Sequence, residues 1–117
     1  MATYGVDWCH KDEKTAIYGD EGLLKKEPEY IHGDIVATEN MPHHKCVELH
    51  HKGVKIYRCN TDLTKNIRER DGIEKTDEND AKIIYEQFKD WHVDGMIGNI
   101  QDERFRKFRY DLNLETL

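Results

Sequence analysis

Long apolar runs are missing from this sequence, which argues against a membrane-spanning helix. Of the 117 residues, 37% are apolar and 36% are charged. No stretch approaches the roughly 20 consecutive apolar residues that cross a bilayer. The chain begins Met-Ala-Thr-Tyr-Gly-Val-Asp, with an acid inside its first apolar run and no basic start. We therefore expect a strand of the mature protein here, not a secretion signal.

Cysteine and proline are also scarce. The three cysteines, Cys9, Cys46 and Cys59, are odd in number and widely spaced, so we predict free thiols in a reducing compartment, the cytoplasm. Two prolines and well-spread aromatic residues argue against disorder. The length suits one domain, and neither repeats nor a linker divide it, so residues 1–117 are predicted to form a single domain.

Charge is distributed unevenly along the chain. The formal net charge of −6 weighs mildly against binding nucleic acid. Residues 1–40 carry 4 basic and 9 acidic side chains, residues 41–76 carry 8 and 5, and residues 77–117 carry 6 and 10, which gives −5, +3 and −4. The middle third is therefore basic. A cluster of metal-binding acids would make the other thirds appear acidic, because the count omits the ions.

The first half of the sequence predicts a hairpin and then a parallel crossover. Residues 3–9 and 14–19 have the pattern of two strands joined by a polar turn, and a third edge strand is expected near 23–26 or 29–32. The predicted crossover begins with a buried strand at 35–38 and ends with another strand at 54–59. Between them a helix is expected at 40–52, with Asn40 as its cap and Gly53 as its stop.

The second half predicts helices. Asn60 or Thr61 can cap a helix that reaches Arg70 and stops at Gly72, and Thr76 can cap another that reaches Trp91. A last amphipathic helix is expected at 102–112, with Phe105, Phe108 and Leu112 on one face. The predicted fold is α/β, a mixed sheet flanked by helices.

Two acids at the start of the 76–91 helix attract attention. Asp77 and Asp80 are three residues apart, which places them about one turn apart on one face. Helix capping explains such a pair as well as any function does. However, Asp80 continues to Ile84 and Phe88, and Asp77 continues to Ala81 and Ile84, so both acids are expected on the core-facing stripe. An acid on a buried face needs a cation or a hydrogen-bond donor.

Two further acids lie in or after predicted strands. Asp7 interrupts the apolar strand between Val6 and Trp8, and Glu39 follows the buried strand 35–38 directly. Ligand sites of α/β sheets lie at the carboxyl ends of strands. Four carboxylates suit Mg²⁺ or Mn²⁺, and two such ions about 4 Å apart can catalyse phosphodiester chemistry.

Three blocks of sequence carry a resemblance to a known family. They are Gly5-Val6-Asp7, Val36-Ala37-Thr38-Glu39, and, most distinctively, Lys75-Thr76-Asp77 followed by Asp80-Ala81. Together they resemble the N-terminal catalytic domain of the DEDD insertion-sequence transposases, which include the pilin-gene inverting recombinases. The resemblance covers roughly residues 3–90.

The resemblance implies an RNase H-like (RuvC-like) fold, with a catalytic core at 1–91 and a C-terminal loop and amphipathic helix at 92–117. It implies metal-dependent DNA cleavage and strand transfer with two Mg²⁺ or Mn²⁺ ions, a DNA substrate and self-association into a dimer or higher oligomer. The four acids of this family correspond to Asp7, Glu39, Asp77 and Asp80. Family members carry a separate C-terminal domain, so an inert binding module derived from a truncated transposase is an alternative.

Basic and histidine-rich segments offer further hypotheses. Four basic residues near the predicted Asp77 helix are candidates for phosphate contacts, although a solvated helix face explains them equally well: Lys65, Arg68, Arg70 and Lys75. A zinc site is a further alternative, because five potential ligands share one predicted helix: His43, His44, Cys46, His50 and His51. The segment lacks Cys-x-x-Cys and His-Glu-x-x-His motifs, which favours a partly exposed polar face.

Overall fold

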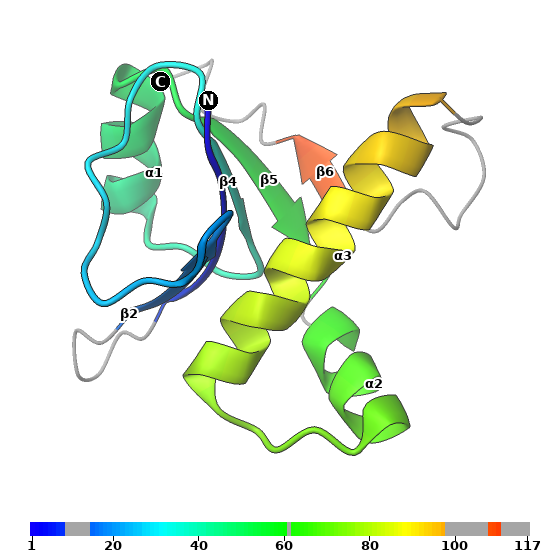
Figure 1. Ribbon diagram of the computed structural model, residues 1–117. Helices are drawn as coiled ribbons and strands as arrows, with labels where there is room; N and C mark the ends of the chain where they lie inside the picture. Colours follow the sequence, from blue (N-terminus) through cyan, green and yellow to red (C-terminus); the bar gives the residue numbers. More distant parts are fainter. Residues whose placement is uncertain (9–14, 61, 98–107, 111–117) are drawn as a thin grey trace.

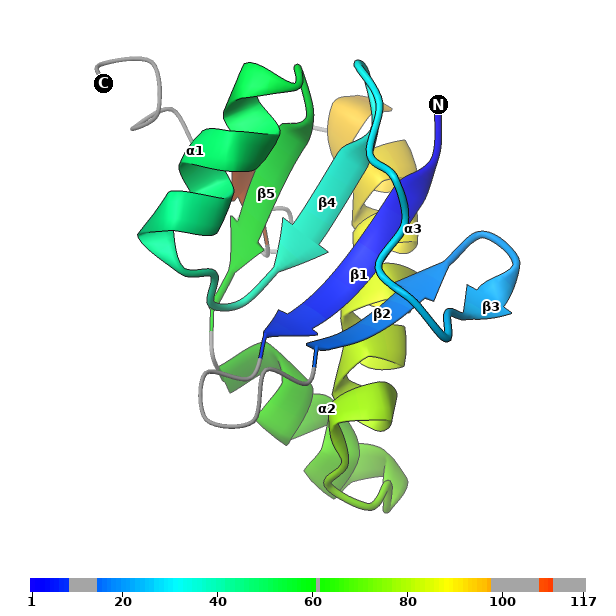
Figure 2. The same cartoon turned by 90° about the vertical axis from the view of Figure 1, so that its left-hand side faces the viewer.

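A six-stranded mixed sheet with helices on both faces forms the protein in the computed structural model, as Figures 1 and 2 show from two sides. The structure describes residues 1–8, 15–60, 62–97 and 108–110. The strands are β1 (Thr3–Trp8), β2 (Thr15–Gly19), β3 (Gly22–Leu23), β4 (Ile35–Thr38), β5 (Lys55–Cys59) and β6 (Phe108–Tyr110). The helices are α1 (His43–His51), α2 (Asp62–Asp71) and α3 (Asp77–Ile97).

The strand order is β3-β2-β1-β4-β5-β6, with β1 near the centre. β1 pairs with β2 in an antiparallel hairpin and with β4 in parallel, and β4 pairs in parallel with β5. The predicted hairpin, the parallel β4-α1-β5 crossover and the mixed sheet are thus confirmed. Because β1, β4 and β5 run in the same direction, their carboxyl ends meet at one edge of the sheet.

Alternating residues of the central strands build a core on each face of the sheet. On one face, Val6 and Val36 pack with Leu49 of α1. On the other face, Ala37 packs with Phe88 of α3. The pattern explains why β4 is buried throughout, since its apolar side chains meet a helix layer on both sides.

Helix α3 crosses the sheet at Gly5 with almost no space between the two backbones. A Cβ atom added to Gly5 would lie 2.5 Å from both the Ala81 carbonyl oxygen and the Tyr85 amide nitrogen. No side chain fits in this gap. Glycine at position 5 therefore lets the first half of α3 rest directly on β1.

Several capping predictions are confirmed. The Asn60 side chain accepts a hydrogen bond from the Asp62 N–H at 3.0 Å, and Thr76 Oγ1 accepts one from the Asn79 N–H at 3.1 Å. The prediction that Asn40 caps α1 is wrong, because Pro42 occupies the cap position without a side-chain hydrogen bond. Gly53 follows the end of α1 with a positive φ of 80°, which suits glycine.

The C-terminal prediction is wrong where the structure can be compared with it. Residues 108–110 form strand β6 instead of part of a helix, and α3 continues beyond Trp91 to Ile97. Phe108 pairs with Cys59 on β5 and is buried among the aromatic side chains of α3. Pairing with the edge of β5 satisfies backbone groups that a helix would leave open. The rest of the predicted helix lies outside the described residues.

Within the described residues, the helices include none that is both long and apolar enough to cross a membrane. Cys46 and Cys59 are buried thiols that form no disulfide with each other, in agreement with the prediction for these two cysteines. Cys9 lies outside the described residues.

Replacing Gly5 with alanine is expected to lower the free energy of unfolding by about 2 kcal/mol or more, because the new methyl group meets rigid helix backbone. Chemical denaturation monitored by circular dichroism measures the change. Gly19→Ala is the matched control, since its methyl group would meet only side-chain atoms, the nearest being a Tyr4 ring carbon at 3.2 Å. Equal losses in the two variants would contradict the close α3–β1 packing.

A carboxylate cluster as the candidate functional site

The pairing of β1 with β4 brings Asp7 and Glu39 together. Gly5 lies opposite Ala37 in the parallel register. Asp7 and Glu39 each follow two residues later, so they project from the face that α3 covers, at the carboxyl edge of the sheet. Strand geometry therefore places these two acids as neighbours.

The first turn of α3 supplies the other two acids, and the contact of α3 with Gly5 places that turn above the same edge. Asp80 is only 8% exposed. Asp77 is exposed, so the prediction that both acids lie on the buried face of the helix is correct only for Asp80. Three residues rotate the helix by about 300°, which moves Asp77 to the border of the buried stripe. From there its side chain hydrogen-bonds with Asp7.

The electrostatics of Asp7 show that all four acids interact. Burial is the largest cause that raises the pKa of Asp7 to about 7, and the charges of Asp77, Asp80 and Glu39 add to it. A side-chain hydrogen bond to Asp77 is a further cause that raises the pKa of Asp7. Carboxylates this close repel one another unless a proton or a cation compensates their charge.

Residues of α2 contact two of the acids, Glu39 and Asp80. The Thr64 N–H donates to Glu39 Oε1 at 3.2 Å, and Arg68 Nε lies 2.9 Å from Asp80 Oδ1. Thr64 and Arg68 are one helical turn apart, so a single face of α2 contacts both acids. The sequence analysis did not identify Thr64, and the available signal was a small polar residue one turn before Arg68.

Burial and the contacts with neighbouring residues shift the pKa values of Glu39 and Asp80 in opposite directions. Burial raises the pKa of Glu39, and the hydrogen bonds from Thr64 act against the rise. Burial likewise raises the pKa of Asp80, and the positive charges of Arg68 and Lys75 act against it. Helix α2 thus stabilises the charged forms of both carboxylates.

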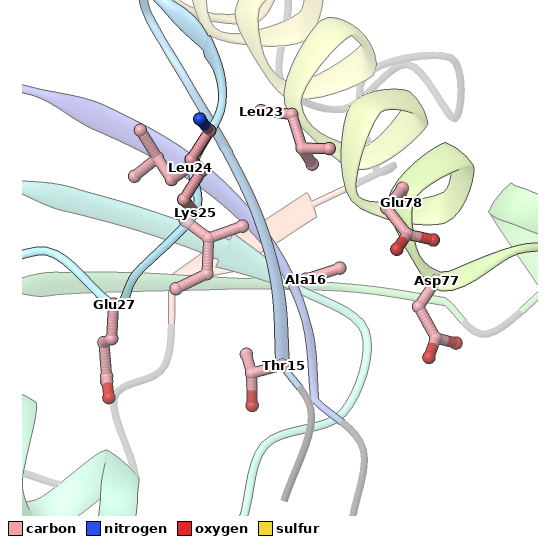
Figure 3. Close-up of a pocket in the computed structure, with 9 residues that line it drawn as sticks. Thr15, Ala16, Leu23, Leu24, Lys25, Glu27, Asp77 and Glu78 are labelled. Atoms are coloured by element: carbon pink, nitrogen blue, oxygen red, sulfur yellow. The ribbon is translucent and has the colours of Figure 1, made fainter.

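A cavity of about 470 Å³ opens beside Asp77, as Figure 3 shows. Asp77 and Glu78 extend from the start of α3 on one side, and side chains of β2 and β3 form the other side. Among them is Ala16, which pairs with Asp7 across β1 and β2. Of the four acids, Asp77 is the one that lines this cavity.

The ligand chemistry of the cluster fits a hard divalent cation. Carboxylate oxygens are the donors that Mg²⁺ and Mn²⁺ prefer. Within the described residues, no three His, Cys, Asp or Glu side chains already surround a point where an ion could bind. The four acids are instead occupied by the Asp7–Asp77 hydrogen bond and by α2. An ion would have to replace these contacts.

The predicted zinc ligands do not converge either. His43 and His44 are exposed, whereas Cys46 is buried and accepts a hydrogen bond from Arg58 at 2.9 Å. Among the described residues, no three of these side chains surround a point where an ion could bind.

The four predicted phosphate-binding residues have different environments. Arg68 points inward to Asp80, and Arg70 pairs with the neighbouring Asp71. Lys65 and Lys75 are exposed. In this arrangement the two lysines are better placed than the arginines to meet a phosphate backbone.

Comparisons with protein-family models, with curated proteins and with solved structures found no match. The geometry and chemistry of the site itself are therefore the basis for the proposed function.

Asp7→Asn is expected to stabilise the metal-free protein above pH 7. The pKa of Asp7 is raised to about 7 from 3.8, so the folded state binds more protons than the unfolded state between these values. The free energy of unfolding of the wild type consequently falls as the pH rises from 4 to 7. Asparagine never acquires the charge and can still donate to Asp77.

The stability difference between the Asp7→Asn variant and the wild type should grow across this pH range and level off above it. After allowance for partial exposure to solvent, we expect about 1–2 kcal/mol. Urea denaturation at several pH values with a chelator measures it, with Asp90→Asn on the exposed side of α3 as control. A difference that does not change with pH would contradict the clustering of the acids.

Proposed function

We propose that the protein is a divalent-metal-dependent DNA nuclease or strand-transfer domain. The observation that carries this proposal is the meeting of four acids from three separate segments at the carboxyl edge of the parallel strands: Asp7, Glu39, Asp77 and Asp80. Stability alone gives no reason to gather four like charges in a half-buried place. A site that binds cations does.

The acids would hold Mg²⁺ or Mn²⁺ in the arrangement that phosphodiester cleavage uses. Two ions bound there would activate a water or a DNA 3′-hydroxyl and stabilise the leaving oxygen. In this proposal Asp7, which lies in β1, and Asp80, the buried acid of α3, would anchor the ions. Glu39 and Asp77 complete the coordination shells, and Asp77 faces the open cavity through which a substrate phosphate would enter.

An RNase H-like, RuvC-like domain is the fold that we propose within the α/β class. Its support is the antiparallel β1–β2 hairpin beside the parallel strands β1, β4 and β5, together with the helix that carries the last two acids against β1. The sequence resemblance to the DEDD transposases depends on the same acids. Self-association would also follow from it.

DNA is the substrate that the surroundings of the site favour. Lys65 and Lys75 lie exposed on and just after α2, the helix that contacts the acids. Lys75 is close enough to affect Asp80 electrostatically. A phosphate strand bound along these lysines would pass beside the cluster.

An inert DNA-binding module is the second candidate. The observation in its favour is that Asp80 already has a cation of the chain itself, Arg68, as its partner. In such a module the acids would be structural, and the lysines alone would bind DNA.

A nuclease assay separates the two candidates. The wild type should cleave single-stranded, duplex or junction DNA with Mg²⁺ or Mn²⁺ and not with a chelator. Asp7→Asn and Asp80→Asn should lower the rate about 100-fold or more, since even outer-shell partners of a metal contribute 10–100-fold. Asp90→Asn, the same change on the same helix away from the cluster, should retain the rate.

Three results would go against the nuclease proposal. Cleavage that survives Asp7→Asn would indicate a contaminating enzyme. DNA binding without any cleavage would favour the inert module. Cleavage that needs no divalent ion would exclude the proposed chemistry.

A further inference from the structure

We propose that Arg68 is a built-in cation of the metal-free site, which a divalent ion must displace from Asp80 before the site becomes active. This inference rests on the proposed function, because it concerns how the same site takes up its ion. It assigns Arg68 a role in controlling metal affinity instead of a role in permanent structure.

The position of Arg68 is the first support. Its Nε atom lies 2.9 Å from Asp80 Oδ1, and the two side chains are only 15% and 12% exposed. The pair joins two helices, α2 and α3, in front of the carboxyl edge of the sheet. Figure 1 shows α2 beside the beginning of α3. The guanidinium group therefore occupies space next to the most buried acid of the cluster.

The quality of the contact is the second support. Arg68 Nε and Asp80 Oδ1 are both buried, and among the described residues neither atom has a well-aligned hydrogen bond. Their attraction is that of opposite charges without the alignment of a hydrogen bond. A buried carboxylate in this condition has coordination capacity left unused. A small divalent ion can use it better than the misaligned guanidinium does.

Arg68 and a divalent ion would compete for Asp80 Oδ1, the oxygen that Arg68 Nε contacts at 2.9 Å. A divalent ion bound to Asp80 would lie within a few ångströms of the guanidinium charge, and like charges that close in a partly buried place repel strongly. In this proposal, metal binding therefore displaces Arg68. The long, flexible arginine side chain can turn toward solvent while α2 stays folded.

Helix α2 also supplies a reason for this arrangement. Thr64, one turn before Arg68, holds Glu39 through its N–H. The face of α2 that contains both residues thus holds Glu39 and Asp80 in place. Arg68 thus keeps the site ready and at the same time competes with its ion.

Removal of Arg68 should tighten metal binding. We expect Arg68→Gln to lower the dissociation constant for Mg²⁺ about 10-fold relative to a control that also loses one positive charge. Arg70→Gln is that control, because Arg70 lies two residues away on α2 but pairs with Asp71 in solvent. Isothermal titration calorimetry of the full chain with Mg²⁺ and no DNA measures both. Equal affinities in the two variants would overturn the proposal.

The effect of Mg²⁺ on thermal stability distinguishes the proposed role of Arg68 from that of a purely structural ion pair. Without metal, Arg68→Gln should melt below the wild type, because Asp80 loses its partner. Saturating Mg²⁺ should remove this deficit, because the ion replaces the arginine in both proteins. A deficit that persists at saturating Mg²⁺ would show that Arg68 is structural and overturn the proposal.

The wild type gives a test that needs no variant, should Arg68→Gln fail to fold. The Arg68 Nε–H resonance should shift and exchange faster with water when Mg²⁺ is added, in step with the Asp80 amide. An Arg68 signal that stays unchanged while the Asp80 amide shifts would overturn the proposal. If no Mg²⁺ binds to the wild type or to either variant, the proposed function fails with it. Binding with no effect of Arg68 removes this inference alone.

Discussion

The close contact between α3 and the backbone of β1 at Gly5 is the constraint on which the site depends. Because no side chain separates the two backbones there, the start of α3 comes down to the sheet edge where Asp7 lies next to the last residue of β1. The parallel register then adds Glu39 from β4. A larger residue at position 5 would lift α3, and the acids on α3 would move away from those on the strands.

This packing brings four carboxylates close together, and other groups of the protein reduce the repulsion between them. A hydrogen bond links Asp7 to Asp77, the Thr64 N–H donates to Glu39, and Arg68 neutralises Asp80. In the proposed metal site, divalent cations would replace all three contacts, because they offer more charge in less space.

The parts of the fold that follow from local periodicity could be predicted from the sequence. The apolar alternation of β1 and β4, the spacing of Asp80, Ile84 and Phe88 on α3, and the cap at Thr76 are short-range properties. Each places a candidate acid on its element. The resemblance of short blocks to a transposase family added an order for these acids, and that identification is still a prediction.

Other features depend on how distant elements meet, which no local pattern encodes. The role of Thr64 and the inward turn of Arg68 depend on where α2 lies against α3. The exposure of Asp77 depends on the rotation of α3 about its axis. β6 was mistaken for a helix because Phe105, Phe108 and Leu112 have helical spacing, whereas the free edge of β5 determined the conformation of residues 108–110.

The most direct test of the central claim is to locate bound Mn²⁺ in the wild-type protein by paramagnetic broadening of backbone amide signals. If the four acids form one metal site, the amides of Asp7, Glu39, Asp77 and Asp80 should broaden first and together, at micromolar to millimolar Mn²⁺. Broadening centred on the histidines of α1, or no localised broadening at millimolar Mn²⁺, would contradict the account.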